Sequence, residues 1–256
     1  MKFQNINIRQ NGFTLVELAI VITIIGILIG GVLKGQQLIE QARIAATIQQ
    51  LKGYETALMI FTTKYDAIPG DMVNAEERII DCEECNADNS NQSGDGIVGR
   101  GIIGRDDQSS KTGEPVRFWL HLMKADLLTG ITDAALTNAP AQWGTTQPAS
   151  KLSGGYSAVS GRAGRTEPGW DAGEPGGLNI IISENIDYHI TGGGASNVLT
   201  VRRTASFDRK IDDGNSQTGD LRGYGRGDCT VANTPNNYNE TYNGAKPCGF
   251  AYKIMN

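Results

Sequence analysis

The stretch from residue 12 to residue 33 constrains this chain most strongly. It reads GFTLVELAIVITIIGILIGGVL, a run of about twenty apolar residues in which Glu17 is the only charged side chain. A run of this length is enough for one α-helix to cross the roughly 30 Å hydrocarbon core of a bilayer. A carboxylate inside such a segment costs about 3 kcal/mol on insertion scales and is therefore retained for a function. The sequence predicts a membrane-spanning helix with a functional acid near its start.

A short basic segment precedes the apolar run. Residues 1–12 read MKFQNINIRQNG and contain Lys2 and Arg9 but no acid. The positive-inside rule places such a segment in the cytoplasm. An ordinary secretory signal has a shorter apolar core that is closed by a small-residue cleavage site, and neither feature is present here. We therefore expect the apolar segment to be kept in the mature protein.

The residues Gly12-Phe13-Thr14-Leu15-Val16-Glu17 resemble the processing site of type IV prepilins and of the pseudopilins of type II secretion. In that family a short basic leader is cleaved after a glycine at the cytoplasmic face, and the new N-terminal residue is N-methylated. The resemblance implies that residues 1–12 are a leader, that cleavage falls between Gly12 and Phe13, and that Phe13 carries the methyl group.

The resemblance also implies a role for Glu17 in assembly. Cleavage leaves a cationic amine on Phe13, and the carboxylate of a neighbouring subunit can neutralise it. Charges that are removed from water require such pairing, so the pair would set the axial register of each incoming subunit. The alternative is that Glu17 sits at the level of the lipid headgroups, since it lies only four residues from the new N-terminus.

The helix is expected to continue well past the apolar run. Residues 34–65 contain no proline, and apolar residues recur at helical spacing at Ile44, Ile48, Leu51, Leu58, Phe61 and Tyr65. The sequence Pro69-Gly70-Asp71 ends the pattern and resembles the helix exit of pilin-like proteins. We predict one helix over residues 13–66, about 80 Å long at 1.5 Å per residue. Its first part, residues 13–33, forms the transmembrane segment and the filament core.

Four glycines interrupt this helix at G-x-x-x-G spacing. Small residues at this spacing let apolar helices approach one another closely, although each glycine weakens the helix by about 1 kcal/mol relative to alanine. We predict helix packing at these positions, and simple tolerance of glycine is the alternative. The two pairs are Gly26 with Gly30 and Gly31 with Gly35.

Residues 67–256 are expected to form a globular head outside the cytoplasm. Most of the 33 glycines lie in this part, which indicates a loop-rich fold. The patterns predict helices over 112–130 and 206–214 and strands over 178–183, 188–191, 198–202 and 249–254. Short strands that follow one another with tight turns favour an antiparallel sheet. The fold class is therefore α+β and pilin-like: a long N-terminal helix carrying a head with an antiparallel sheet and glycine-rich loops.

All four cysteines follow the apolar run, where an oxidising compartment permits disulfides. A Cys229–Cys248 disulfide would close a loop of about 20 residues, and it is similar to the disulfide-bound C-terminal loop of many pilins. For Cys82 and Cys85 we expect a local structural disulfide. A redox pair and half of a zinc site are the alternatives for this C-x-x-C motif.

Two acidic loops contain the oxygen ligands that calcium prefers. The first contains Asp88 and Asp95 and lacks the spacing of an EF-hand. The second contains Asp212, Asp213 and Asp220, and it resembles acidic loops of some pilin-like heads in which calcium is associated with folding. Calcium is the cofactor that these two loops indicate, and ordinary turns are the alternative at both loops.

The sequence gives no sign of an enzyme. It contains no nucleophile elbow, metal-ligand cluster or nucleotide loop, and His121 and His189 have no evident partners. The net charge of -5 also disfavours a nucleic-acid partner. The function expected is that of a structural subunit that polymerises into a type IV pilus or a related pseudopilus, for attachment, motility, DNA uptake or secretion. The alternative is a membrane-anchored extracytoplasmic binding protein or enzyme.

The expected partners follow from the resemblance. They are other pilin or pseudopilin subunits, the prepilin peptidase and methyltransferase, and the assembly platform with its ATPase. The protein is expected to lie in the bacterial inner membrane as a single-pass precursor and then in a surface pilus or a periplasmic pseudopilus. The sequence leaves pilus and pseudopilus open, and a head of nearly 190 residues favours a minor subunit.

Overall fold

The computed structural model describes residues 14–83, 85–86, 93–99, 113–132, 142–161, 175–184, 198–225, 229–231, 238–242, 244 and 248–256. By its internal contacts the chain divides into two units, Met1–Arg43 and Ile44–Asn256. The leader residues Gly12 and Phe13, the loop residue Asp88, and the expected strand over 188–191 lie outside the described residues.

A single helix, α1 (Leu15–Tyr65), runs through both units. In the first unit none of its residues from Leu15 to Arg43 is buried. It contains an 18-residue window of mean hydropathy 2.6, and this window has no buried part. It is the one helix among the described residues that is long and apolar enough to cross a membrane. Apolar side chains that face outward on every side of a helix match a lipid or helical environment.

In the second unit, one face of α1 enters the core of the head. Five of the six residues that the helical spacing predicted are buried: Ile44, Leu51, Leu58, Phe61 and Tyr65. Ile48 is only partly buried, and the same face also buries Thr47, Tyr54 and Ala57, which the pattern of apolar residues missed. Asp66 ends the helix in the left-handed conformation, with φ of 46°. Its N–H donates to the Thr62 carbonyl, and the Arg78 guanidinium donates to the Tyr65 carbonyl. The last turn thus receives the partners that a helix end requires.

The head contains a four-stranded antiparallel sheet in the order β1-β2-β4-β3. Its strands are β1 (Gly155–Gly161), β2 (Gly177–Ser183), β3 (Leu221–Tyr224) and β4 (Gly249–Met255). At the centre, Ile180 pairs with Ala158 on one side and with Tyr252 on the other. The C-terminal strand therefore lies inside the sheet, between β2 and β3.

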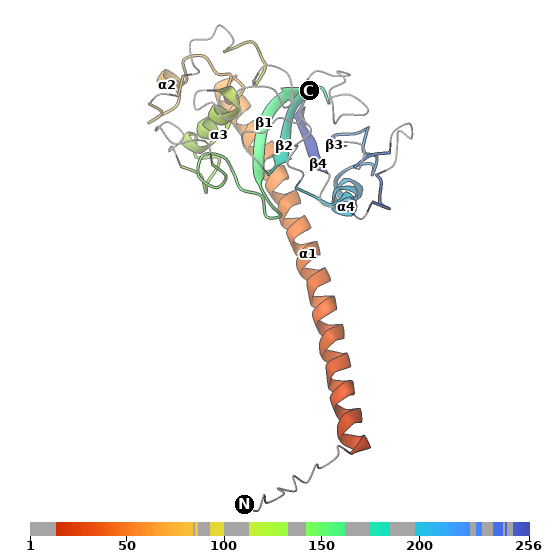
Figure 1. Cartoon of the computed structure of the whole chain (residues 1–256). Helices are drawn as coiled ribbons and strands as arrows, with labels where there is room; N and C mark the ends of the chain where they lie inside the picture. The colour runs from red at the N-terminus through yellow and green to blue at the C-terminus, as the bar shows by residue number, and fades with distance from the viewer. Residues whose placement is uncertain are drawn as a thin grey trace, which may run out of the picture. The chain divides into compact units, whose positions relative to one another are not determined.

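Side chains alternate between the two faces of the sheet. Leu178, Ile180 and Ile182 belong to the main core, together with the buried face of α1. Val159, Ile181, Tyr224 and Ala251 form a second, smaller cluster. Helix α3 (Glu114–Lys124) contacts β1, and α4 (Val201–Ile211) contacts β3, so the two helices lie toward opposite edges of the sheet (Figure 1). A short helix, α2 (Ala75–Arg78), follows the exit of α1.

The structure confirms the α+β, pilin-like layout and corrects several elements. The strand expected over 198–202 is wrong: only Leu199 forms a bridge, to Cys248, and Val201 already begins α4. That helix ends at Ile211, earlier than the expected 214. Helix α3 ends at Lys124 instead of reaching Gly130, because Asp126 adopts a φ of 60°. The sequence patterns also missed β1 and β3.

Candidate processing and assembly site

Glu17 is hydrogen-bonded to the first residue that the structure describes. Its Oε2 accepts hydrogen bonds from the N–H and the hydroxyl of Thr14, both at 2.9 Å. In return, the Thr14 hydroxyl oxygen lies 3.2 Å from the N–H of Glu17, which donates to it. This reciprocal pattern is a capping box, in which Thr and Glu three residues apart satisfy the free N–H groups at a helix start. Helix α1 therefore begins directly after position 14, and the Glu17 carboxylate is part of its cap.

The sequence analysis named Glu17 and missed Thr14. The signal was present, since T-x-x-E before an apolar run is the pattern of a capping box. The resemblance implies that Glu17 pairs with Phe13 of a neighbouring subunit, whereas in the structure of one chain Glu17 pairs with Thr14 of the same chain. Among the described residues, Thr14 is also the nearest to the expected cleavage position between Gly12 and Phe13.

The four glycines in the apolar part of α1 have open surroundings. A Cβ atom built on Gly26, Gly30, Gly31 or Gly35 would meet no atom within 4 Å outside the helix's own nearby backbone. These positions therefore form shallow notches on an exposed apolar helix. The backbone of a second helix can approach closely at such notches.

Both pairs of cysteines form disulfides in the structure. Cys82 is joined to Cys85 and Cys229 to Cys248, the pairs named in the sequence analysis. All four cysteines are buried. The second bridge spans 19 positions and fixes the start of β4 next to Leu199.

His121, for which the sequence offered no partner, is bonded inside the core. Its Nδ1 accepts from the N–H of Gly70 at 2.9 Å, and its Nε2 lies 3.0 Å from the Cys85 carbonyl oxygen. Burial lowers the pKa of His121 to about 4, and the charge of Arg117 acts in the same direction. The residue is therefore a neutral structural contact. His189 lies outside the described residues.

Three carboxylates gather at the end of α4. Ligand oxygens of Asp208, Asp212 and Asp213 lie within 4.8 Å of one another, the one such group found among the described residues. Burial raises the pKa of Asp208 to about 6, and its hydrogen bonds from Tyr238 and Gly214 oppose that shift. The sequence analysis missed Asp208 because it precedes the acidic loop and reads as an ordinary helix residue.

The other acidic residues of the two loops have different surroundings. Asp220 forms an ion pair with Lys253 at 3.0 Å and donates its N–H to Asp212. Asp95 accepts from the N–H of Ile97, as in an ordinary turn. The neighbouring backbone N–H groups of residues 94–96 donate to the carboxylate of Asp71. Asp208, Asp212 and Asp213 are thus the carboxylates that the structure brings together.

Comparison with known proteins agrees with the N-terminal geometry. Residues 7–33 match the family model described as the prokaryotic N-terminal methylation motif. This is the leader motif of type IV pilins and pseudopilins, so the chain carries a pilin-type leader motif at the start of its apolar helix. The motif supports a pilin-like or pseudopilin-like precursor. Searches of the curated proteins and of the solved structures gave no match to the chain.

Proposed function

We propose that this chain is the precursor of a structural subunit of a type IV pilus or a related pseudopilus. A peptidase removes the leader 1–12 between Gly12 and Phe13, and a methyltransferase modifies the amine of Phe13. The mature chain then polymerises through the helix 13–66 and displays the head 67–256. The observation that carries this proposal is the methylation motif at 7–33, which includes the capped start of the apolar helix α1.

The capping box gives Glu17 two successive roles in this proposal. In the single subunit, two Thr14 donors satisfy the carboxylate within the apolar segment. During assembly the same carboxylate turns to the cationic amine of Phe13 on a neighbouring subunit. The Thr14 donors are neutral, whereas the amine of Phe13 is itself charged, so the new pair joins two opposite charges and the exchange favours the polymer. Glu17 thereby fixes the register of each added subunit.

The glycine notches serve the packing of the same helices. Once the amine and the carboxylate pair, neighbouring α1 helices lie close together, and Gly26, Gly30, Gly31 and Gly35 allow their backbones to approach. Before assembly the precursor is held in the inner membrane with its head outside the cytoplasm. The assembly platform and its ATPase then transfer it into a surface pilus or a periplasmic pseudopilus. This role is structural and not enzymatic.

Calcium is proposed as a stabilising ligand of the second acidic loop. Asp212 and Asp213 were named from the sequence, and Asp208 completes a group of three close carboxylate oxygens. Carboxylate oxygens are the ligands that calcium takes in proteins. A cation there would offset the mutual repulsion of the three charges. Asp220, which pairs with Lys253, stands at the edge of the group.

Mass spectrometry of the protein from its native membranes tests the proposal. The expected N-terminus is Phe13 carrying one methyl group. A Glu17→Ala variant is expected to insert into the membrane, to be cleaved, and to form few or no filaments. An intact Met1 in the membrane-bound protein would overturn the prepilin interpretation in favour of a permanently anchored binding protein. Normal filaments from Glu17→Ala would remove the register role.

A further inference from the structure

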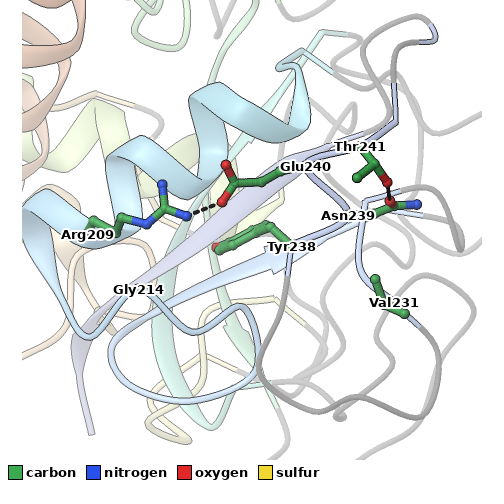
Figure 2. A pocket seen from close by; sticks show the side chains of 7 residues that line it. All are labelled: Arg209, Gly214, Val231, Tyr238, Asn239, Glu240 and Thr241. Carbon is green, nitrogen blue, oxygen red and sulfur yellow. Dashed lines mark hydrogen bonds and ion pairs between the residues drawn. The ribbon is translucent and has the colours of Figure 1, made fainter.

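A pocket of about 320 Å³ lies in the head beside the end of α4. Helix α4 contributes Arg209 and the turn after it contributes Gly214. The remaining lining comes from Val231 and residues 238–241, which belong to the segment between Cys229 and Cys248 (Figure 2). Nothing in the proposed polymerisation through α1 uses this pocket.

The walls of the pocket are held in place before any ligand arrives. Cys229 is fixed by its disulfide, and its carbonyl accepts the N–H of Asn239 at 3.0 Å. The Tyr238 hydroxyl donates to Asp208 at 2.8 Å, which anchors the tyrosine to α4. Arg209, the next residue along that helix, forms an ion pair with Glu240. A pocket whose walls are already ordered loses little entropy on binding.

The polar groups around the pocket include both donors and acceptors. The Thr241 hydroxyl donates to the Asn239 Oδ1 at 2.9 Å, which leaves the Asn239 amide hydrogens and the Thr241 oxygen lone pairs for a ligand. The side chains of Arg209 and Glu240, which also line the pocket, are 55% and 41% exposed and therefore accessible from solvent. Figure 2 shows these side chains around one space.

The chemistry of the lining excludes several ligand classes. Arg209 and Glu240 neutralise each other, so the pair gives the pocket no net charge that would favour an anion or a cation. Tyr238 is only 6% exposed, so its ring offers no open face on which a nucleobase could stack. The volume lies at the small end of the range for ligand pockets. The lining therefore favours a small neutral ligand whose hydroxyls both donate and accept.

We infer that this pocket binds a single neutral sugar residue, such as a hexose or N-acetylhexosamine at the end of a glycan. Each sugar hydroxyl can accept from the Asn239 amide or the Arg209 guanidinium and donate to Thr241 or Glu240. Val231 supplies apolar surface for the C–H groups of the ring. This inference goes beyond the structural role proposed for the chain and does not depend on it, because the described lining residues all belong to the head of one subunit.

Saturation-transfer NMR on the full chain tests the inference. The protein is placed in lipid nanodiscs, since sugar-based detergents would compete. The probes are the methyl glycosides of glucose, galactose and N-acetylglucosamine at millimolar concentration, with glucosamine and glucuronate as charged probes. The expected result is saturable binding of at least one neutral glycoside and none of the charged sugars. Absence of binding by every neutral glycoside, or binding of a charged sugar instead, overturns the inference.

Pocket variants establish where the sugar binds. Asn239→Ala is expected to weaken binding about tenfold, the effect of one lost hydrogen bond. Thr241→Val keeps the shape of the side chain and is expected to weaken binding severalfold, so it tests the pocket even where Asn239→Ala fails to fold. The matched control is Thr56→Val, which removes an exposed hydroxyl that donates to the Lys52 carbonyl of α1. Equal affinity in Thr241→Val and Thr56→Val overturns the assignment to this pocket.

Discussion

The Nδ1 atom of His121 accepts a hydrogen bond from the backbone N–H of Gly70, 51 residues earlier in the chain. The other ring nitrogen, Nε2, donates to the carbonyl oxygen of Cys85. Only the neutral imidazole can make both bonds, because a protonated ring would place a hydrogen on Nδ1 against the N–H of Gly70. His121 therefore joins α3 to the exit turn of α1 and to the Cys82–Cys85 loop, provided that it stays neutral.

The first prediction concerns the stability of the folded chain at acidic pH, where His121 becomes protonated. The folded pKa of His121 is about 4, below the value of about 6.5 expected in the unfolded chain. Between these values the unfolded state binds the proton, so the stabilising contribution is complete above pH 6.5 and is lost as the pH falls toward 4. The free energy of unfolding should decrease by up to about 3 kcal/mol over that window. Urea unfolding at a series of pH values measures it.

The chain offers a matched control for that experiment. His121→Gln should lower the free energy of unfolding at pH 7.5 by about 2 kcal/mol, because buried partners lose a hydrogen bond. It should also remove most of the acid slope. His189→Gln, at the only other histidine, should retain the slope. An unchanged slope in His121→Gln would assign the acid sensitivity to other groups.

The second prediction concerns Asp208, whose contribution to stability should change with pH in the opposite direction to that of His121. The folded pKa of Asp208 is about 6, above the value of about 3.9 for an unfolded aspartate, so the folded state holds the proton more tightly. Its contribution to stability is present below pH 4 and is lost as the pH rises through 6. In calcium-free buffer, Asp208→Asn should therefore flatten this part of the pH profile, whereas exposed Asp126→Asn should not. A retained slope in Asp208→Asn would contradict the assignment.

The third prediction concerns calcium at the same carboxylates. If Asp208, Asp212 and Asp213 hold the ion, a chelator should lower the melting temperature of the head at neutral pH by several degrees, since ligand binding stabilises the folded state. Asp213→Asn should abolish the difference between calcium and chelator. Asp95→Asn, in the other acidic loop, should leave it intact. Identical melting of the wild-type protein with and without chelator would dismiss calcium at both loops.

The elements that could be predicted from sequence are those whose formation depends on residues close to one another in the chain. The buried face of α1 follows from apolar residues three and four positions apart, such as Leu51, Leu58 and Phe61. The closing strand follows from a β-rich run at the C-terminus. The run Val198–Arg202 has the same strand-like composition, yet its last two residues begin α4. Tertiary packing outweighs strand propensity there, because Val201 and Ala205 are buried on one helix face.

The side-chain partners of the site had no such local cause. His121 pairs with residues 51 and 36 positions away, and Asp208 pairs with Tyr238 across 30 positions. Nothing in the spacing of a single sequence specifies such contacts. Thr14 is the instructive exception, because its contact with Glu17 is local and its pattern was readable.

The fourth prediction tests the cap itself. Thr14→Val keeps the size of the side chain and removes one of the two groups that donate to Glu17. The capped helix start should lose about 1 kcal/mol of stability. The amount of subunit in the membrane and the yield of filaments should both fall. Thr23→Val is the matched control, because the Thr23 hydroxyl donates to the Ala19 carbonyl one turn earlier and takes no part in the cap. Equal behaviour of the two variants in immunoblots of membranes and sheared filaments would contradict a role for the cap.

The last prediction compares two glycines in different surroundings. Gly70 has a φ of 87°, and a Cβ there would lie 2.5 Å from the Glu114 carbonyl oxygen and 3.0 Å from the Phe118 nitrogen. Gly70→Ala should therefore destabilise the head by more than about 1 kcal/mol, the cost of the left-handed conformation alone. Gly53 lies within α1, where a Cβ would meet nothing within 4 Å. Gly53→Ala should stabilise the isolated subunit by about 0.5–1 kcal/mol, because alanine is the better helix former. Thermal unfolding of the two variants measures both effects, and a Gly70→Ala protein as stable as the wild type would show that the contact between the exit turn and α3 is looser than the structure describes. If Gly53→Ala stabilises the subunit as expected but reduces filament yield, the exposed face of α1 at Gly53 contacts a neighbouring subunit.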